Sequence, residues 1–194
     1  MSVTTDIQGQ VARITLDNPD KRNAFDDIII ASLTEAFEKI GSDASVRVVV
    51  LQAAGKHYAA GADLNWMCPM GKLDAHQTPQ DALRLAALMQ AIDHCAKPVI
   101  ARVQGAAFGG ALGLICAADM AVAADNARFC LSEVKLGIVP AVISPYVVRA
   151  MGPRQANRYF MTAEVIPADR AQQIGIVHEV VSEDALDSTV DALV

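Results

Sequence analysis

Two short, largely aliphatic runs constrain the fold of this chain more than any other feature. Residues 46–51 read VRVVVL and residues 99–103 read VIARV, a pattern typical of strands that are buried on both faces of a sheet. Each run is followed by a segment of glycine, alanine and small polar residues, and then by a helical pattern. This alternation predicts an α/β domain with mainly parallel strands, because parallel neighbours need a crossover connection of about that length.

The rest of the chain continues the alternation. A strand is expected at 11–16, a helix at 26–41 that Asp26 can cap, and a long helix at 80–95 that stops before Pro98. The segment 105–119, GAAFGGALGLICAAD, predicts a glycine-rich turn that leads into an apolar helix ending at Asp119. Further strands are expected at 120–123, 128–131 and 176–180, and further helices at 144–151, 154–161, 167–173 and the chain end.

Composition and charge bound the class of protein. The 194 residues are 53% hydrophobic and 20% charged, with a formal net charge of −6 and no run of three basic residues. This is the composition of an ordinary folded domain. Nucleic acid and anionic membranes are therefore not expected as partners, whereas net charge does not decide whether a small phosphate-bearing ligand binds.

The cysteines and the first residues of the chain favour a cytoplasmic protein. Cys68, Cys95, Cys116 and Cys130 form no C-x-x-C pair, which favours reduced, buried thiols. The N-terminus lacks the basic and apolar regions of a signal peptide. The longest apolar run, 106–118, is shorter than the roughly 20 residues of a membrane-spanning helix.

Metal chemistry and serine acyl transfer have no matching pattern. His57, His76, His94 and His178 show neither H-E-x-x-H nor another metal-ligand spacing. No G-x-S-x-G turn is present to activate a serine. We therefore expect no metal site and no serine nucleophile.

The glycines after the 99–103 strand allow two interpretations. Gly105, Gly109, Gly110 and Gly113 are spaced G-x-x-x-G-G-x-x-G, which differs from the G-x-G-x-x-G turn that binds dinucleotides. They can serve only for close helix packing, or they can expose N–H groups at a helix start to a developing negative charge. The loop 55–64 has the same character, so the two loops together can form an oxyanion hole.

Five segments resemble motifs of the crotonase (enoyl-CoA hydratase/isomerase) superfamily. GKHYAAGADLNWM and VQGAAFGGALGLICAADMAVA are similar to its two oxyanion-hole motifs, and ARFCLSEVKLGIVPAVISPYVVRAMG to its catalytic-acid segment. NPDKRNAF resembles its coenzyme A loop, and MTAEVIPADRAQQIGIVHEVV its later helix and strand. The resemblance runs in order over residues 11–182 and implies a spiral of ββα units, an α/β fold.

The resemblance also implies an organisation and an assembly. Residues 1–194 are expected to form a single spiral core domain, with most of the family's C-terminal trimerisation helices absent from this chain. The expected assembly is a homotrimer or a dimer of trimers.

The resemblance assigns the catalytic groups. The backbone N–H groups of Ala62 and Gly110 would form the oxyanion hole, and Glu133 would be the acid/base. Family hydratases usually carry two glutamates, whose positions here hold Gly113 and Glu133, so the sequence departs from the family at the first. Glu133 alone would have to deprotonate water and deliver a proton to the α-carbon.

Coenzyme A is expected as part of the thioester substrate, with no permanently bound cofactor. The resemblance implies that backbone groups around Ala24, Ala60, Asp63 and Leu64 bind adenine and pantetheine. Lys21, Arg22 and Lys56 would lie near the phosphates unless they are ordinary surface charges. Trp66 begins the acyl pocket or packs in the core. The length and the prolines of the 68–80 segment make it a candidate lid over the acyl end. The predicted substrate-binding residues are Lys21, Arg22, Ala24, Lys56, Ala60, Asp63, Leu64, Trp66, Gly109 and Gly113.

The function predicted from this resemblance is hydration of an α,β-unsaturated acyl-CoA thioester. GGALGL together with FCLSEVKLGIVPAVISPYVV resembles the 3-methylglutaconyl-CoA and isohexenylglutaconyl-CoA hydratases, which act in leucine and acyclic-terpene breakdown and whose substrates carry a distal carboxylate. Two alternatives remain open at this point: a double-bond isomerase, which also works with one glutamate, and a non-catalytic binding protein with the same fold.

Overall fold

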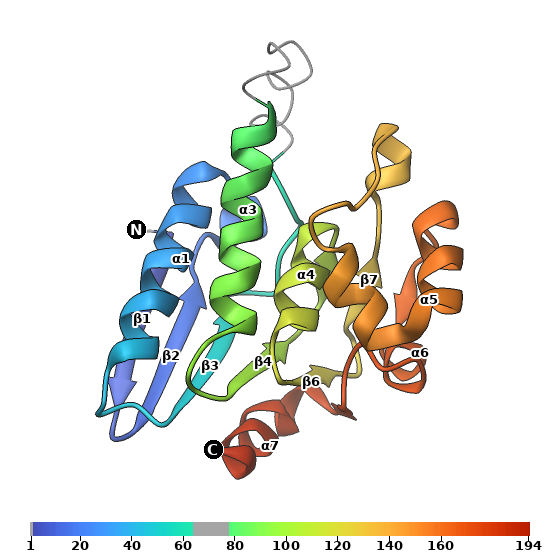
Figure 1. Cartoon of the computed structure of the whole chain (residues 1–194). Coiled ribbons are helices and arrows are strands. Elements are labelled where there is room, and N and C mark those ends of the chain that lie inside the picture. Colours follow the sequence, from blue (N-terminus) through green and yellow to red (C-terminus); the bar gives the residue numbers. More distant parts are fainter. Residues whose placement is uncertain (1, 64–77) are drawn as a thin grey trace.

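A mostly parallel sheet forms the centre of the molecule in the computed structural model, which describes residues 2–63 and 78–194 (Figure 1). Its strand order is β1-β2-β3-β4-β6-β9, and only the β1–β2 pair is antiparallel. The two aliphatic runs of the sequence form the central strands β3 and β4, as predicted. The strands are β1 (Val3–Gln8), β2 (Val11–Leu16), β3 (Val48–Ala53), β4 (Val99–Val103), β6 (Met120–Ala124) and β9 (Glu179–Val181).

Helices cover both faces of this sheet. Alternate strand residues such as Val49 and Leu51 join the main core, whereas Val48 and Val50 face the other way and pack against α7. In Figure 1, α1, α3 and α4 lie in front of the sheet and α7 lies at its lower edge. The helices are α1 (Asp27–Ser42), α3 (Thr78–Asp93), α4 (Gly110–Ala117), α5 (Ser144–Thr162), α6 (Ala168–Gln173) and α7 (Leu186–Leu193), with short 3-10 helices η1 (Pro19–Lys21), η2 (Glu133–Leu136) and η3 (Glu183–Ala185).

A second, smaller sheet contains β5 (Ala106–Phe108), β7 (Arg128–Cys130) and β8 (Ile166–Pro167). The chain passes from β4 into β5 and then α4, and from β6 into β7 and then towards α5. Each passage is one ββα unit, so the expected spiral is confirmed. The small sheet is important for function because isolated bridges between Ala59 and Ala107 and between Phe25 and Ala62 extend it across the two glycine-rich loops.

The predicted elements and the observed ones differ at a few places. Helix α5 joins the two helices predicted at 144–151 and 154–161, but Gly152 has non-helical angles (φ 77°, ψ 155°) directly before Pro153, where the break was expected. The edge strand β1 was missed because VTTDIQ lacks apolar alternation and is ordered by pairing with β2. The helix expected at Asp63 and most of the 68–80 segment lie outside the described residues.

Side-chain details agree with the prediction except at Cys95, which is half-buried rather than buried. Asp26 caps α1, since its Oδ1 accepts a hydrogen bond from Ile29 N at 3.0 Å. Cys116 and Cys130 are buried, and burial raises the pKa of Cys116 to about 12. Within the described residues, no helix combines the length and the apolar character that a membrane crossing requires.

Tyr58 provides a test of the core. Its hydroxyl is fully buried without a hydrogen-bond partner among the described residues, and burial raises its pKa. An unpaired buried hydroxyl costs about 1–3 kcal/mol. We therefore expect Tyr58→Phe to leave the free energy of unfolding unchanged or to raise it by about 1 kcal/mol in urea denaturation.

Tyr159→Phe is the matched control, because the buried Tyr159 hydroxyl accepts a hydrogen bond from Arg170 Nε at 3.3 Å. That variant should lose about 0.5–1.5 kcal/mol, the usual contribution of one hydrogen bond. A clear loss of stability in Tyr58→Phe would show that its hydroxyl has a partner after all, such as a buried water.

Candidate active site

The two glycine-rich loops meet through hydrogen bonds along their backbones. The loop 54–63 is bound on one side by Phe25, whose N donates to Gly61 O and whose O accepts from Asp63 N, both at 3.0 Å. On its other side, Phe108 N donates to Ala59 O at 3.0 Å. The loop therefore continues the small sheet and ends beside the start of α4.

Gly61 makes the closest approach between the loops. A Cβ on Gly61 would lie 2.7 Å from Phe108 O and 3.6 Å from Gly110 N, and its φ of +87° also favours glycine. Any larger residue would push the two loops apart. The structure thus brings Ala62 and Gly110, the two predicted oxyanion-hole residues, next to each other.

Both backbone N–H groups of this pair are available. Among the described residues, neither Ala62 N nor Gly110 N donates a hydrogen bond. Gly110 N is the first N–H of α4, where the helix leaves N–H groups unpaired and its dipole is positive. Two such donors at the edge of a buried region can polarise a carbonyl and stabilise the negative charge that develops on it.

Glu133 lies directly beside this pair. It begins η2 after strand β7, and its Oε1 is 3.4 Å from the position that a Cβ on Gly109 would take. Its Oε2 is buried without a partner among the described residues. Burial raises the pKa of Glu133 above its usual range, and a hydrogen bond from its own backbone N–H opposes this only in part. A carboxyl group with a raised pKa is suited to both accept and donate a proton.

Gly113 lies deeper in the structure than the sequence suggested. A Cβ on Gly113 would lie 2.3 Å from Ile143 Cγ2 and 2.9 Å from Met89 Sδ. The place of the family's first glutamate is therefore filled by two apolar side chains. This packing does not support the predicted contact between Gly113 and substrate, and it leaves Glu133 as the carboxylate of the pair.

The predicted coenzyme A residues gather on the outer side of the first loop. Ala60 N donates to Arg22 O at 2.9 Å, and Lys21 Nζ pairs with Asp63 Oδ2 at 3.3 Å. Burial, together with the charges of Arg22 and Lys56, lowers the pKa of His57. Both basic side chains therefore contribute positive charge near the His57 ring. Ala24 N donates to Lys21 O at 3.1 Å within the same turn. Leu64 and Trp66 lie outside the described residues.

Two buried amide side chains hold these loops and were missed by the sequence analysis. Asn23 Nδ2 donates to Ala54 O at 2.9 Å and to His57 O at 2.8 Å. Gln104 Nε2 donates to Ala53 O at 2.8 Å and to Gly55 O at 3.0 Å. Both are almost fully buried. The available signal was an amide residue placed at a strand or turn end next to small residues, where it can bind unpaired backbone carbonyls.

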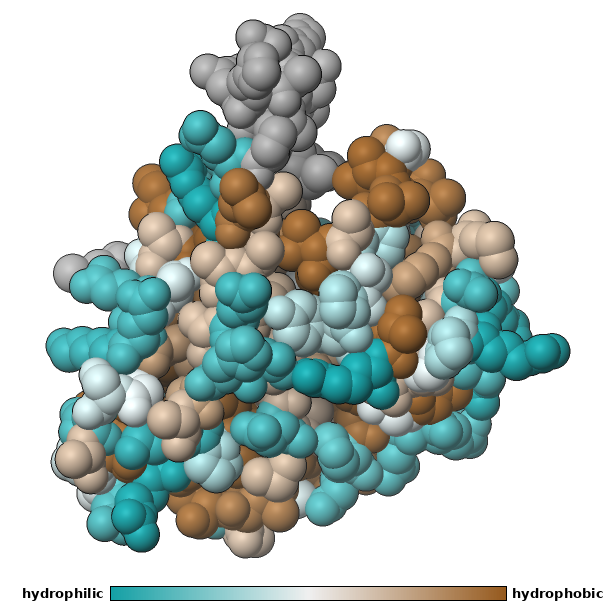
Figure 2. Space-filling view, viewed as in Figure 1, coloured by the Kyte–Doolittle hydropathy of each residue, from teal (hydrophilic) through white to brown (hydrophobic). Residues whose placement is uncertain are grey.

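An apolar surface adjoins Glu133. Val134, Leu136, Ile138 and Val139 are all exposed, and Figure 2 shows hydrophobic side chains gathered at the tip formed by η2 and the following loop. This surface can contact an apolar ligand or another part of a larger assembly.

Comparison with known proteins shows the family of this chain. Residues 6–194 match the family described as enoyl-CoA hydratase/isomerase. The chain belongs to this family. It is 48% identical, with a TM-score of 0.95, to the crystal structure of an enoyl-CoA hydratase from Shewanella pealeana, covering 100% of this chain and 74% of that one. The crotonase resemblance and the spiral fold are thereby confirmed.

Curated relatives of the family are longer than this chain. An enoyl-CoA hydratase of Alternaria alternata is 36% identical over 180 residues, which are 92% of this chain and 58% of the relative. The 2,3-dehydroadipyl-CoA hydratase of Escherichia coli is 36% identical over 179 residues, which are 91% of this chain and 68% of the relative. The chain therefore spans about three fifths of the length of the Alternaria relative.

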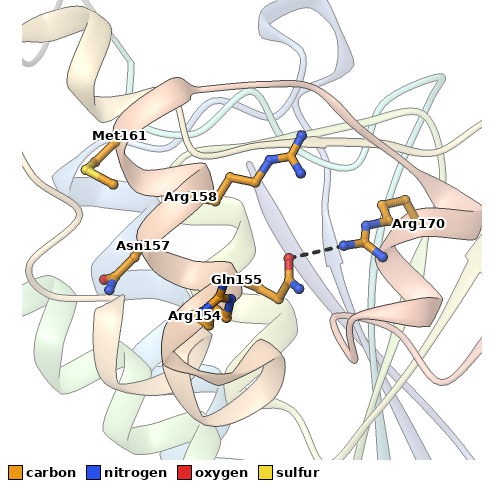
Figure 3. A pocket seen from close by; sticks show the side chains of 6 residues that line it. All are labelled: Arg154, Gln155, Asn157, Arg158, Met161 and Arg170. Atoms are coloured by element: carbon orange, nitrogen blue, oxygen red, sulfur yellow. Dashed lines mark hydrogen bonds between the residues drawn. The ribbon is translucent and has the colours of Figure 1, made fainter.

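Two surface cavities lie away from these loops. One, of about 420 Å³, is lined by Arg154, Gln155, Asn157, Arg158, Met161 and Arg170 (Figure 3). Its arginines are partly engaged, since Arg170 donates to Gln155 at 3.1 Å and Arg158 pairs with Glu164 at 2.8 Å. The other, of about 570 Å³, lies at the C-terminal end of α4 beside the Arg149–Asp93 ion pair. Neither cavity includes Ala62, Gly110 or Glu133.

The burial of Glu133 predicts how the stability of the protein depends on pH. The folded state raises the pKa of Glu133, so it favours the protonated form more than the unfolded chain does. The stability of the native protein is therefore fully present below the ordinary carboxyl pKa and falls as pH rises through the raised value. We expect Glu133→Gln to be more stable than the native protein near pH 7, with the difference shrinking towards pH 4 in thermal denaturation.

Glu164→Gln is a suitable control, because Glu164 is exposed and paired with Arg158. It should give no such gain at pH 7. A Glu133→Gln protein that is less stable than the native protein at pH 7 would contradict the unpaired, buried state of this carboxyl group.

Proposed function

We propose that this chain carries the catalytic core of an enoyl-CoA hydratase, a single domain that adds water across the double bond of an acyl-CoA thioester. The observation that carries the proposal is the position of Glu133. Its carboxyl group, with a buried and unpartnered oxygen, borders Gly109. Gly110, which follows Gly109 in the chain, supplies one of the two free N–H groups. An oxyanion hole and one acid/base group thus lie together.

In the proposed reaction, the oxyanion-hole N–H groups and Glu133 have separate roles. The N–H groups of Ala62 and Gly110 bind the thioester oxygen. Glu133 as carboxylate accepts a proton from water while the water oxygen bonds to the β-carbon and the π electrons move to form an enolate. Glu133 then returns the proton to the α-carbon, and the thioester carbonyl re-forms. Water is added without a redox change, so the proposed reaction needs no further cofactor.

We further propose an acyl group with a distal carboxylate, such as 3-methylglutaconyl or isohexenylglutaconyl. Ile143 and Met89 cover Gly113, so the first carboxylate of the two-glutamate site is missing, and a carboxylate of the substrate can help to hold the water. The Escherichia coli relative is named for 2,3-dehydroadipyl-CoA, whose acyl group also ends in a free carboxylate. In the cell, such a substrate would place the protein in the breakdown of leucine or terpenes.

Double-bond isomerisation is the second candidate, because one glutamate beside an oxyanion hole can move a proton between two carbon atoms. We also propose that the whole protein assembles as a homotrimer or a dimer of trimers, as its family resemblance implies.

The first test measures enoyl-thioester absorbance with 3-methylglutaconyl-CoA and crotonyl-CoA, using the native protein and Glu133→Gln. We expect hydration by the native protein, a preference for the carboxylated substrate, and a loss of at least about 100-fold in the variant, because the acid/base group is removed. Activity that survives the substitution would remove Glu133 from the mechanism. Double-bond migration without hydration would make the protein an isomerase.

A second test concerns the coenzyme A phosphates. Arg22 and Lys56 are exposed beside His57, so we propose that they bind these phosphates. Arg22→Ala and Lys56→Ala should each raise KM for CoA esters several-fold with little change in kcat, because phosphate contacts bind ground state and transition state alike. Arg84→Ala is the control, since Arg84 lies on α3 and pairs with Asp81. A lower kcat with unchanged KM would contradict this assignment.

A further inference from the structure

Ser132 occupies a helix-capping position but does not cap. It precedes η2, where a serine side chain usually accepts a hydrogen bond from an N–H of the first turn. No such side-chain bond is formed here, and the turn is closed by Lys135 N, which donates to the backbone oxygen of Ser132 at 3.0 Å. The hydroxyl has no hydrogen-bond partner among the described residues.

The free hydroxyl lies at the active site instead. The atoms nearest to the position of a Cβ on Gly109 are Glu133 Oε1 at 3.4 Å, Ser132 Oγ at 3.7 Å and Glu133 Cδ at 3.9 Å. The space over Gly109 is therefore bordered by two oxygen atoms from neighbouring residues. Gly109 has a φ of +54° and no side chain, so nothing of its own fills this space.

We infer that Ser132 is the second water-holding residue of this site and replaces in function the glutamate that is absent at Gly113. This inference rests on the proposed hydratase activity. One O–H of a water molecule over Gly109 donates to the Glu133 carboxylate and the other donates to Ser132 Oγ. Both protons are then directed away from the substrate, and a lone pair of the water oxygen faces the β-carbon.

The packing around Gly113 supports this arrangement. Ile143 Cγ2 and Met89 Sδ fill the place beside Gly113, and both side chains are buried and apolar, so they cannot hold water. Ser132 Oγ, at 3.7 Å from the position of a Cβ on Gly109, borders this space together with Glu133. The step itself is unchanged: the proton leaves the water for Glu133, and Ser132 forms no covalent bond.

The test separates hydration from proton transfer at carbon. Glu133 and the oxyanion hole are sufficient to exchange the α-proton of a saturated acyl-CoA, such as butyryl-CoA, into D2O, because that reaction forms an enolate without a nucleophilic water. We expect Ser132→Ala to lower kcat for hydration by about tenfold, the loss typical of one hydrogen bond. KM and the α-proton exchange rate should change by less than about twofold.

Two further variants test whether Ser132 acts through its hydroxyl at the active site or only through the local fold. Ser132→Thr keeps a hydroxyl and should recover most of the hydration rate. Ser182→Ala is the matched control, because Ser182 also precedes a 3-10 helix without a side-chain cap bond, and Ala185 N donates to its backbone oxygen at 3.0 Å. It should leave both reactions unchanged.

The outcomes separate this inference from the proposed function. A native protein that hydrates and a Ser132→Ala variant that hydrates equally well would overturn the role of Ser132 and leave the hydratase proposal intact. Equal losses of hydration and exchange would also overturn it, because Ser132 would then support Glu133 or the fold. A native protein that exchanges the α-proton but does not hydrate would overturn both proposals.

Discussion

The close approach of Gly61 to the start of α4 is the contact on which the site depends. A Cβ at this position would meet Phe108 O at 2.7 Å, so the missing side chain allows two backbones to touch. The bonds of Phe25 on one side and of Ala59 on the other place the loop in register with β5. This backbone alignment brings the free N–H groups of Ala62 and Gly110 together, and the buried amide side chains of Asn23 and Gln104 hold the loop in place. Backbone donors held by a sheet need little reorganisation when charge develops, which is the condition for effective oxyanion stabilisation.

The same region contains a carboxyl group in an unfavourable environment. Glu133 is placed next to the oxyanion loop with one oxygen buried and unpartnered, and burial raises its pKa. Buried polar groups normally have partners, so the unpartnered oxygen beside the two N–H groups supports the proposed acid/base role of Glu133. Asn23 and Gln104 show the opposite arrangement, because each satisfies the loop carbonyls that would otherwise be unpaired. Among the described residues, the carbonyls bound by these amides are satisfied, whereas Glu133 Oε2 is not.

The departure at Gly113 is a change in packing as well as in chemistry. Ile143 and Met89 occupy the space beside this glycine, so a glutamate could not be restored there without moving both side chains. A hydratase with this core therefore needs another group that holds the water beside Glu133. Ser132 has the required position, and its unused capping ability explains why its hydroxyl is free. The distal carboxylate of the proposed substrate can contribute in addition.

The sequence by itself determined the α/β class, the order of the main elements, the Asp26 cap and, through motif resemblance, the family; it also predicts Ala62, Gly110 and Glu133 as site residues. These follow from local periodicity and from short segments whose residues act where they stand in the chain. The edge strand β1, the small sheet that joins the loops, the packing over Gly113, and the roles of Asn23, Gln104 and Ser132 came only from the tertiary structure. Each depends on contacts between residues far apart in the sequence or on the direction in which one side chain turns. No local pattern encodes either of these, because the partner is chosen only when the helices and sheets have packed.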